Sequence, residues 1–319
     1  MNDEYLWDKS GEPDPEIVRL EQLLSGFGHE QKPMRLARTW NWYRYAAAVA
    51  LVAALVAAAG AWWFLPREPR TTWDVASVQG APRVANVAIG KTGKLSSGES
   101  LETDAHAVAR LEVGNIGEVT VDPNSRVTLV KSHENEHRLS LQRGVIHALI
   151  WAPPRQFFVD TPSAVAVDLG CRYTLKVDDS GDGLLTVETG WVAFEAHGRE
   201  SFIPAGAACP TTRAAGPGLP YYLDSTTAFR NALLSGNTKA ALAEARPHDA
   251  MTLWHMLSRV PQAQRAAVYT QMASMAPPPD GVTREGVLAL RQPMMDQWWD
   301  SLGLDSANWW RRWKSDWRQ

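Results

Sequence analysis

Apolar and polar residues alternate along much of the chain between about residues 77 and 212, and this period of two predicts half-buried strands. The clearest runs are 108–113 (VARLEV), 118–121 (EVTV), 126–129 (RVTL), 138–141 (RLSL), 173–177 (YTLKV) and 191–195 (WVAFE). Turn-forming residues separate them, as at Asp122-Pro123-Asn124 and Thr161-Pro162. We therefore expect residues 77–215 to form an all-β domain, either a sandwich or a short β-solenoid.

The pattern becomes helical after Gly216-Pro217-Gly218, so residues 216–319 are predicted to form a small α-helical bundle. The candidate helices are 227–234, 238–246, 250–260, 263–275 and 284–291. In the third of them, Leu253, Trp254 and Leu257 share one apolar face, and Asp249 is placed to cap its start.

The stretch 45–65 (YAAAVALVAALVAAAGAWWFL) carries no charged side chain. A helix of that length reaches roughly 31 Å, which matches the hydrocarbon core of a bilayer. We expect one transmembrane helix here, followed by a linker, 66–76. A cleaved signal peptide is the alternative, because Ala59-Gly60-Ala61 resembles a cleavage site, but the charged leader is too long for one.

Positive charge is unevenly distributed around this span. Lys32, Arg35, Arg38 and Arg44 precede it closely, whereas Arg67 and Arg70 follow it. The positive-inside rule then places residues 1–44 in the cytoplasm and the rest of the chain outside, in the periplasm or its equivalent. The sequence thus predicts a single-pass protein of the inner (cytoplasmic) membrane.

The cytoplasmic segment 1–44 is too short for a core of its own. Asp14 and Pro15 are typical of a helix start, and Ile17, Leu20, Leu23 and Leu24 give the helix that follows one apolar face. Leu6 and Trp7 add a small apolar cluster upstream. The polar face is acidic, which favours a protein partner over an anionic membrane surface. A tail with a transient helix is the alternative.

Several motifs of the β region occur together in a fixed order over about 110 residues. They comprise Pro123, Ser125 and Val127; Arg143 and Gly144; Thr161, Pro162 and Ala164; Gly170, Tyr173 and Leu175; Val187, Gly190 and Val192; and Ala205-Gly206. In this order the chain resembles the FecR-domain family. Cys171 stands where that family usually has a threonine.

The resemblance implies a single-span regulator. Its cytoplasmic segment would bind an extracytoplasmic-function sigma factor, here through Leu6, Trp7, Ile17, Leu20 and Leu24, and its outer part would receive a signal from a periplasmic or envelope partner. Residues 1–44 are shorter than a full anti-sigma domain and lack a His/Cys zinc cluster. An envelope-anchored structural or glycan-binding protein without a sigma factor is the alternative.

Neither composition nor motifs point to an enzyme or a cofactor. The net charge of −3 gives no reason to expect nucleic acid as a partner. The stretch from His133 to His137 (HENEH) fits the zinc-protease pattern, but it lies between two predicted strands and is therefore expected to be a hairpin tip. Residues 178–183 (DDSGDG) lack a full calcium-loop pattern and are expected to be a solvated turn.

Cys171 and Cys209 are the only two cysteines, and both fall on the predicted oxidising side. A disulfide between them is the favoured prediction, with two separate buried thiols as the alternative.

The C-terminal tail is rich in tryptophan and in basic residues. Trp309, Trp310, Trp313 and Trp317 are candidates for a periplasmic partner surface, with a membrane surface as a further possibility. Alternatively, Trp298, Trp299, Trp309 and Trp310 cover the core of the bundle.

Overall fold

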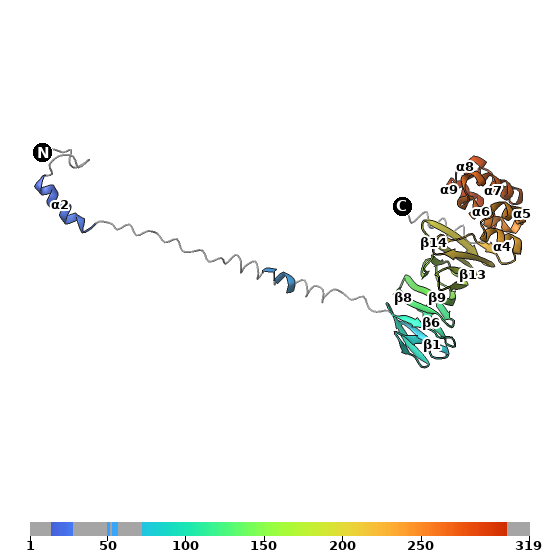
Figure 1. Ribbon diagram of the computed structural model, residues 1–319, viewed down its shortest axis with the longest axis horizontal. Coiled ribbons are helices and arrows are strands. Elements are labelled where there is room, and N and C mark those ends of the chain that lie inside the picture. The colour runs from blue at the N-terminus through green and yellow to red at the C-terminus, as the bar shows by residue number, and fades with distance from the viewer. Residues whose placement is uncertain (1–13, 28–49, 52, 57–71, 305–319) are drawn as a thin grey trace. The chain divides into compact units, whose positions relative to one another are not determined.

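The computed structural model describes residues 14–27, 50–51, 53–56 and 72–304 (Figure 1). The chain divides into two compact units, residues 1–67 and 68–319, which are considered separately. The predicted contact residues Leu6 and Trp7 and the four tail tryptophans from Trp309 to Trp317 lie outside the described residues.

In the first unit, helix α2 (Pro15–Ser25) begins and ends as predicted. The Asp14 carboxylate accepts a hydrogen bond from the Glu16 amide at 3.0 Å, Pro15 occupies the first turn, and Gly26 is the C-cap. Of the predicted span, residues 50, 51 and 53–56 are described, and they are helical. Among the described residues there is no helix whose length and apolarity would let it cross a membrane.

The second unit begins with a large, curled, mostly antiparallel sheet of two layers. The first layer contains, in spatial order, β4 (Thr92–Ser96), β1 (Thr72–Gln79), β6 (Val108–Val113), β7 (Gly117–Val121), the second half of β9 (Glu136–Ile150), β12 (Arg172–Val177), β13 (Gly183–Thr189) and β16 (Ala207–Thr212), with β17 (Gly216–Pro217) and β18 (Tyr221–Tyr222) beside β16.

The second layer contains β3 (Val87–Ala88), β2 (Arg83–Val84), β5 (Ser100–Glu102), β8 (Arg126–His133), the first half of β9, β10 (Phe157–Asp160), β11 (Val165–Asp168), β14 (Trp191–Ala196) and β15 (Arg199–Pro204). Among the pairings of the described strands, that of β9 with β10 is parallel and the others are antiparallel. The all-β prediction is confirmed, and the antiparallel pairing in two layers favours a sandwich over a solenoid.

Strand β9 joins the two layers. Its first half pairs with β8 and its second half with β7 and β12. The change occurs at Gly144, whose φ is +96°. A Cβ atom there would lie 2.1 Å from Ser125 Oγ, so the crossing requires glycine on both backbone and steric grounds. The sequence pattern divided this stretch into shorter strands because Arg143-Gly144 is typical of a turn.

The core lies between the layers and follows from the alternation. Leu111, Val119, Ala148, Tyr173 and Val187 occupy successive partner positions from β6 to β13 and are all buried. The residues next to them on each strand face outward, as the period of two requires.

The helical region begins after Tyr222. The sequence pattern had placed its start after residue 215, but the short strands β17 and β18 come first. Its elements are α4 (Thr227–Leu234), α5 (Thr238–Glu244), the short 3-10 helix η1 (Pro247–Asp249), α6 (Ala250–Arg259), α7 (Gln262–Met275), α8 (Arg284–Leu288) and α9 (Gln292–Asp300). The five predicted helices are present to within two residues at most ends. Helix α9, with Pro293 in its first turn, was not predicted.

The helices pack on the sheet and share its core. Trp298 and Trp299 are fully buried, as the core interpretation of these two residues predicts. The Trp299 ring lies 5.8 Å from that of Phe202 on β15 and 6.2 Å from that of Trp191 on β14. Helices α4 to α9 and the β region therefore form one continuous packed body.

Asp249 does not cap α6 with its side chain. Its buried carboxylate instead accepts hydrogen bonds from Ser225 Oγ at 2.6 Å and from the Arg246 amide at 2.9 Å. The predicted cap is wrong because these donors, on the segment between β18 and η1, hold the carboxylate away from the free amides of α6.

Candidate functional site

The apolar face of α2 is the candidate partner-binding surface. Leu20, Leu23 and Leu24 are 56%, 69% and 61% exposed, and no residue of the helix is buried. Ile17 continues the same face one turn earlier and is partly covered. Three leucines within two turns form an apolar stripe of the kind that inserts into a hydrophobic groove.

The H-E-x-x-H stretch is a hairpin tip, as predicted. His133 ends β8 and pairs with Glu136 at the start of β9, with Glu134 and Asn135 in the turn between them. His137 points inward: its Nδ1 lies 3.1 Å from Ser132 Oγ, which also accepts a hydrogen bond from Trp73 Nε1. Burial, and secondarily the neighbouring His133, lowers the pKa of His137. The two imidazoles therefore do not share the helical face that a zinc protease requires.

Residues 178–183 contain the expected turn, in which Asp178, Asp179 and Ser180 are exposed. The Asp178 carboxylate accepts hydrogen bonds from the Ser180 hydroxyl and amide and from the Asp182 amide. These bonds lower the pKa of Asp178, with the Ser180 hydroxyl as the main cause. The described part of the chain contains no group of three or more His, Cys, Asp or Glu side chains suited to a metal ion.

The predicted disulfide is wrong: Cys171 and Cys209 are both buried free thiols. Strand β13 separates them, because it lies between β12, which Cys171 precedes, and β16, which contains Cys209. Two strand spacings amount to about 9.5 Å, whereas a disulfide needs Cα atoms within about 7 Å. The alternative of two separate buried thiols is the one observed.

Cys171 belongs to a buried polar cluster at a crossing between the layers. The segment runs from Asp168 at the end of β11, in the second layer, through Gly170 to β12, in the first layer. The Asp168 carboxylate accepts hydrogen bonds from Cys171 Sγ at 2.6 Å and from the Gly170 amide at 2.7 Å. Gly190, on the return crossing from β13 to β14, packs against it so closely that a Cβ atom would lie 2.2 Å from the Gly170 carbonyl oxygen.

Burial is the main cause of the pKa shifts in this cluster. It raises the pKa of Asp168 from 3.8 to about 7, although the hydrogen bonds from Cys171 and Gly170 act in the opposite direction. Burial, and then the charge of Asp168, raises the pKa of Cys171. Within the described part of the chain, the buried Tyr173 hydroxyl has no hydrogen-bond partner, and burial raises its pKa well above the ordinary value. The thiol is therefore protonated at neutral pH and is a poor nucleophile.

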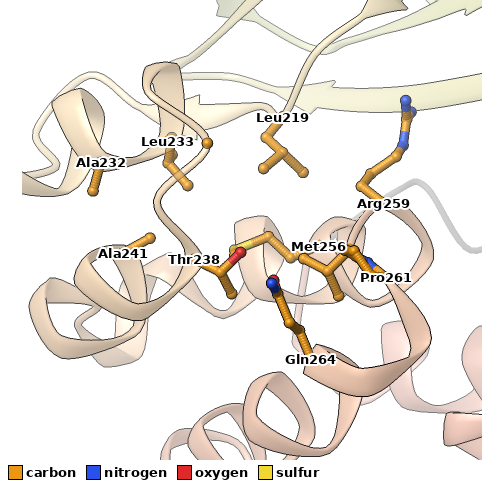
Figure 2. A pocket seen from close by; sticks show the side chains of 11 residues that line it. Leu219, Ala232, Leu233, Thr238, Ala241, Met256, Arg259, Pro261 and Gln264 are labelled. Carbon is orange, nitrogen blue, oxygen red and sulfur yellow. The ribbon is translucent and has the colours of Figure 1, made fainter.

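A cavity of about 300 Å³ lies where the helices meet the segment after β17 (Figure 2). Its walls are mainly apolar, and Leu219, Met256 and Gln264 point into it. Arg259 lies at its border, with its guanidinium donating to the carbonyl oxygens of Pro217 and Glu200. The lining contains no carboxylate, histidine or cysteine, so its chemistry suits an apolar group rather than acid–base catalysis.

Sequence reasoning did not find Asp168 or His255, two buried titratable residues whose hydrogen bonds fix their position. Asp168 ends an apolar run (VAVD) and precedes glycine, which is an ordinary strand end. His255 lies within the apolar face of α6. Their surroundings depend on strands that are distant in sequence, so no local signal marks them.

Comparison with known proteins gives one family match. Residues 99–193 match the model of the family described as FecR protein. No curated protein matches the chain. Two crystal structures of a candidate anti-sigma factor from Parabacteroides distasonis ATCC 8503 are similar at 12% and 14% identity, each with a TM-score of 0.35. The matches cover 45% and 43% of this chain and 74% and 64% of the other chains. The family match confirms, over residues 99–193, the resemblance to the FecR family that the motif order indicates.

Proposed function

We propose that this chain is a membrane-anchored regulator of FecR type rather than an enzyme. In this proposal, residues 45–65 cross the inner membrane once, residues 1–44 are cytoplasmic, and the unit that contains residues 72–304 receives a signal in the periplasm or an equivalent compartment. The cytoplasmic partner is an extracytoplasmic-function sigma factor. The FecR match of residues 99–193 supports the regulatory class, and the charge asymmetry around residues 45–65 supports the orientation.

The main support for a partner contact is helix α2, which is capped at its start and exposes a face of leucine side chains. An isolated helix of 11 residues is marginal in water. The cap at Asp14 and the apolar stripe together favour a helix that becomes stable when a partner covers it. Glu16 and Glu21, each one turn away from a residue of the apolar face, favour a groove bordered by basic residues.

The test begins with identification of the partner in the native cell. A photo-crosslinking residue replaces Leu24 in the full chain, and the same residue replaces Gln22 as the control position on the opposite side of α2. We expect capture of a sigma factor from position 24 and much less from position 22. Capture of an envelope protein alone from position 24 would instead support the structural or glycan-binding alternative.

A matched pair of double variants then measures the contact. Leu20→Asp with Leu24→Asp places two charges on the apolar face, and Val18→Asp with Gln22→Asp places the same charges at the same spacing on the other face. Interface anchors commonly contribute 2 kcal/mol or more, so the first pair should weaken binding by at least about 30-fold. The control pair should remain within a few-fold of the wild type. Equal binding by both pairs would show that α2 is not the contact.

A further inference from the structure

Helix α6 contacts the edge of β15 that faces away from β14. Among the described strands, β15 pairs with β14. On its other side, the Phe202 amide donates a hydrogen bond to His255 Nε2 at 3.1 Å, and Arg259 Nη2 donates to the Glu200 carbonyl oxygen at 3.0 Å. In a strand, the backbone N–H and C=O groups of alternate residues point toward the same side. Two side chains of α6 therefore satisfy the edge groups that a further strand would otherwise bind.

His255 can make these contacts in one form only. Its Nδ1 lies 2.9 Å from the Met251 carbonyl oxygen, which can only accept, so Nδ1 carries the proton. Its Nε2 accepts from the Phe202 amide and must therefore be unprotonated. The ring is 1% exposed and lies edge-on against Trp254 and Trp299, with ring centres 5.0 and 5.4 Å away. The joint thus selects a neutral histidine.

A second proton on His255 would place an N–H group against the Phe202 N–H group and a positive charge in a buried site. The charged residues of the three elements around the ring are Arg259 on α6, Arg199 and Glu200 on β15, and Asp296 and Asp300 on α9. Arg259, one turn along from His255, is already engaged with β15 and would repel the new charge.

We infer that the joint between α6 and β15 is an acid-sensitive latch, closed by neutral His255 and opened by its protonation. A released imidazole binds its second proton near pH 6.5, so acid favours the open joint. If protonation occurs only in the open state, lowering the pH from 7.5 to 5.0 multiplies the population of that state by about 30. The latch does not depend on the identity of the cytoplasmic partner. Only its exposure to external pH rests on the proposed topology.

The chain contains a natural reporter of this opening. Cys209 is fully buried on β16, and its thiol lies 3.5 Å from the Gly218 carbonyl oxygen, beside the segment that Arg259 and Ser201 bind. Cys171, at the crossing between the layers, serves as the internal control. In detergent-solubilised full chain, the rate of labelling of each thiol by dithiodipyridine is measured by mass spectrometry between pH 7.5 and 5.0. Each rate is divided by that of the urea-unfolded chain at the same pH.

We expect the normalised labelling of Cys209 to rise by about 30-fold toward pH 5.0, while that of Cys171 does not rise. His255→Gln keeps an acceptor for the Phe202 amide but cannot bind a proton, so its Cys209 labelling should be independent of pH. His248→Gln is the matched control, because His248 is an exposed histidine of the same region, stacked on Tyr222. It should retain the full acid response.

Two results would overturn the latch. One is the same pH response of Cys209 in the wild type and in folded His255→Gln. The other needs no variant: nitrogen NMR of histidine-labelled wild-type chain would show a doubly protonated His255 while Cys209 remains protected.

Discussion

Substitution of Asp168 by asparagine should stabilise the protein at neutral and alkaline pH. The folded state raises the pKa of this carboxyl group from 3.8 to about 7, mainly through burial. The folded chain therefore holds the proton at pH values where the unfolded chain has released it. Each unit of pKa difference corresponds to about 1.4 kcal/mol, so the burial of Asp168 costs about 4 kcal/mol once the pH is above 7.

The sign of the pH dependence follows from the same difference. Between pH 4 and 7 the folded state binds more protons at Asp168 than the unfolded state does. The contribution of this residue to stability therefore falls as the pH rises through that window and is constant above it. An asparagine resembles the protonated acid, because its oxygen can still accept from the Gly170 amide.

Urea unfolding of the wild type and of Asp168→Asn at several pH values between 4 and 8 tests this expectation. The difference in the free energy of unfolding should be small at pH 4 and should approach about 4 kcal/mol at pH 8, or about 10 °C in Tm. Asp179→Asn, which changes an exposed aspartate of the same sheet, should track the wild type. A variant that is less stable than the wild type at pH 8 would refute the reasoning, since it would show that the carboxylate is stabilised in place.

Three further predictions concern the turns, the motif and the topology. Gly190→Ala should destabilise the β region by at least about 3 kcal/mol in urea unfolding, because its Cβ would strike the Gly170 carbonyl group; Gly206→Ala, with a similar φ of +76° and open space around it, should cost only about 1 kcal/mol. Purified protein should contain no stoichiometric zinc by metal analysis, and Glu134→Gln should leave regulation unchanged; one tightly bound zinc ion per chain would contradict the hairpin interpretation. An alkaline phosphatase fused after Gln319 should be active in cells, and activity of a cytoplasmic reporter at the same position would reverse the proposed orientation.

The type and order of most strands and helices could be predicted because each has its own periodic pattern of apolar residues. Strands were recognised from alternation, as in 108–113, and helices from caps and apolar faces, as in α2, or from an apolar face, as in α6. Helix α9 was missed although Pro293 lies in its first turn, where proline is favourable. The strand β9 was divided at Gly144, since a glycine within a strand has the same local appearance as a turn.

The buried polar sites depend on which strands become neighbours, and one sequence does not encode that order locally. The disulfide prediction failed for this reason: compartment and cysteine count suggested a pair, but the insertion of β13 between β12 and β16 could not be seen. His255 illustrates the same limit. Its hydrogen bond to the Phe202 amide of β15 joins residues more than 50 positions apart in sequence.

The family match ends within β14, but the folded unit does not. Strand β15 pairs with β14, α6 satisfies the outer edge of β15, and Trp299 packs against Trp191 at the start of β14. At the other end of the first layer, β1 precedes the matched segment and pairs with both β4 and β6. Because all these contacts belong to one packed core, helices α4 to α9 complete the sheet rather than forming an independent module. A change in α6 therefore reaches the edge of β15 directly, through the hydrogen bonds of His255 and Arg259.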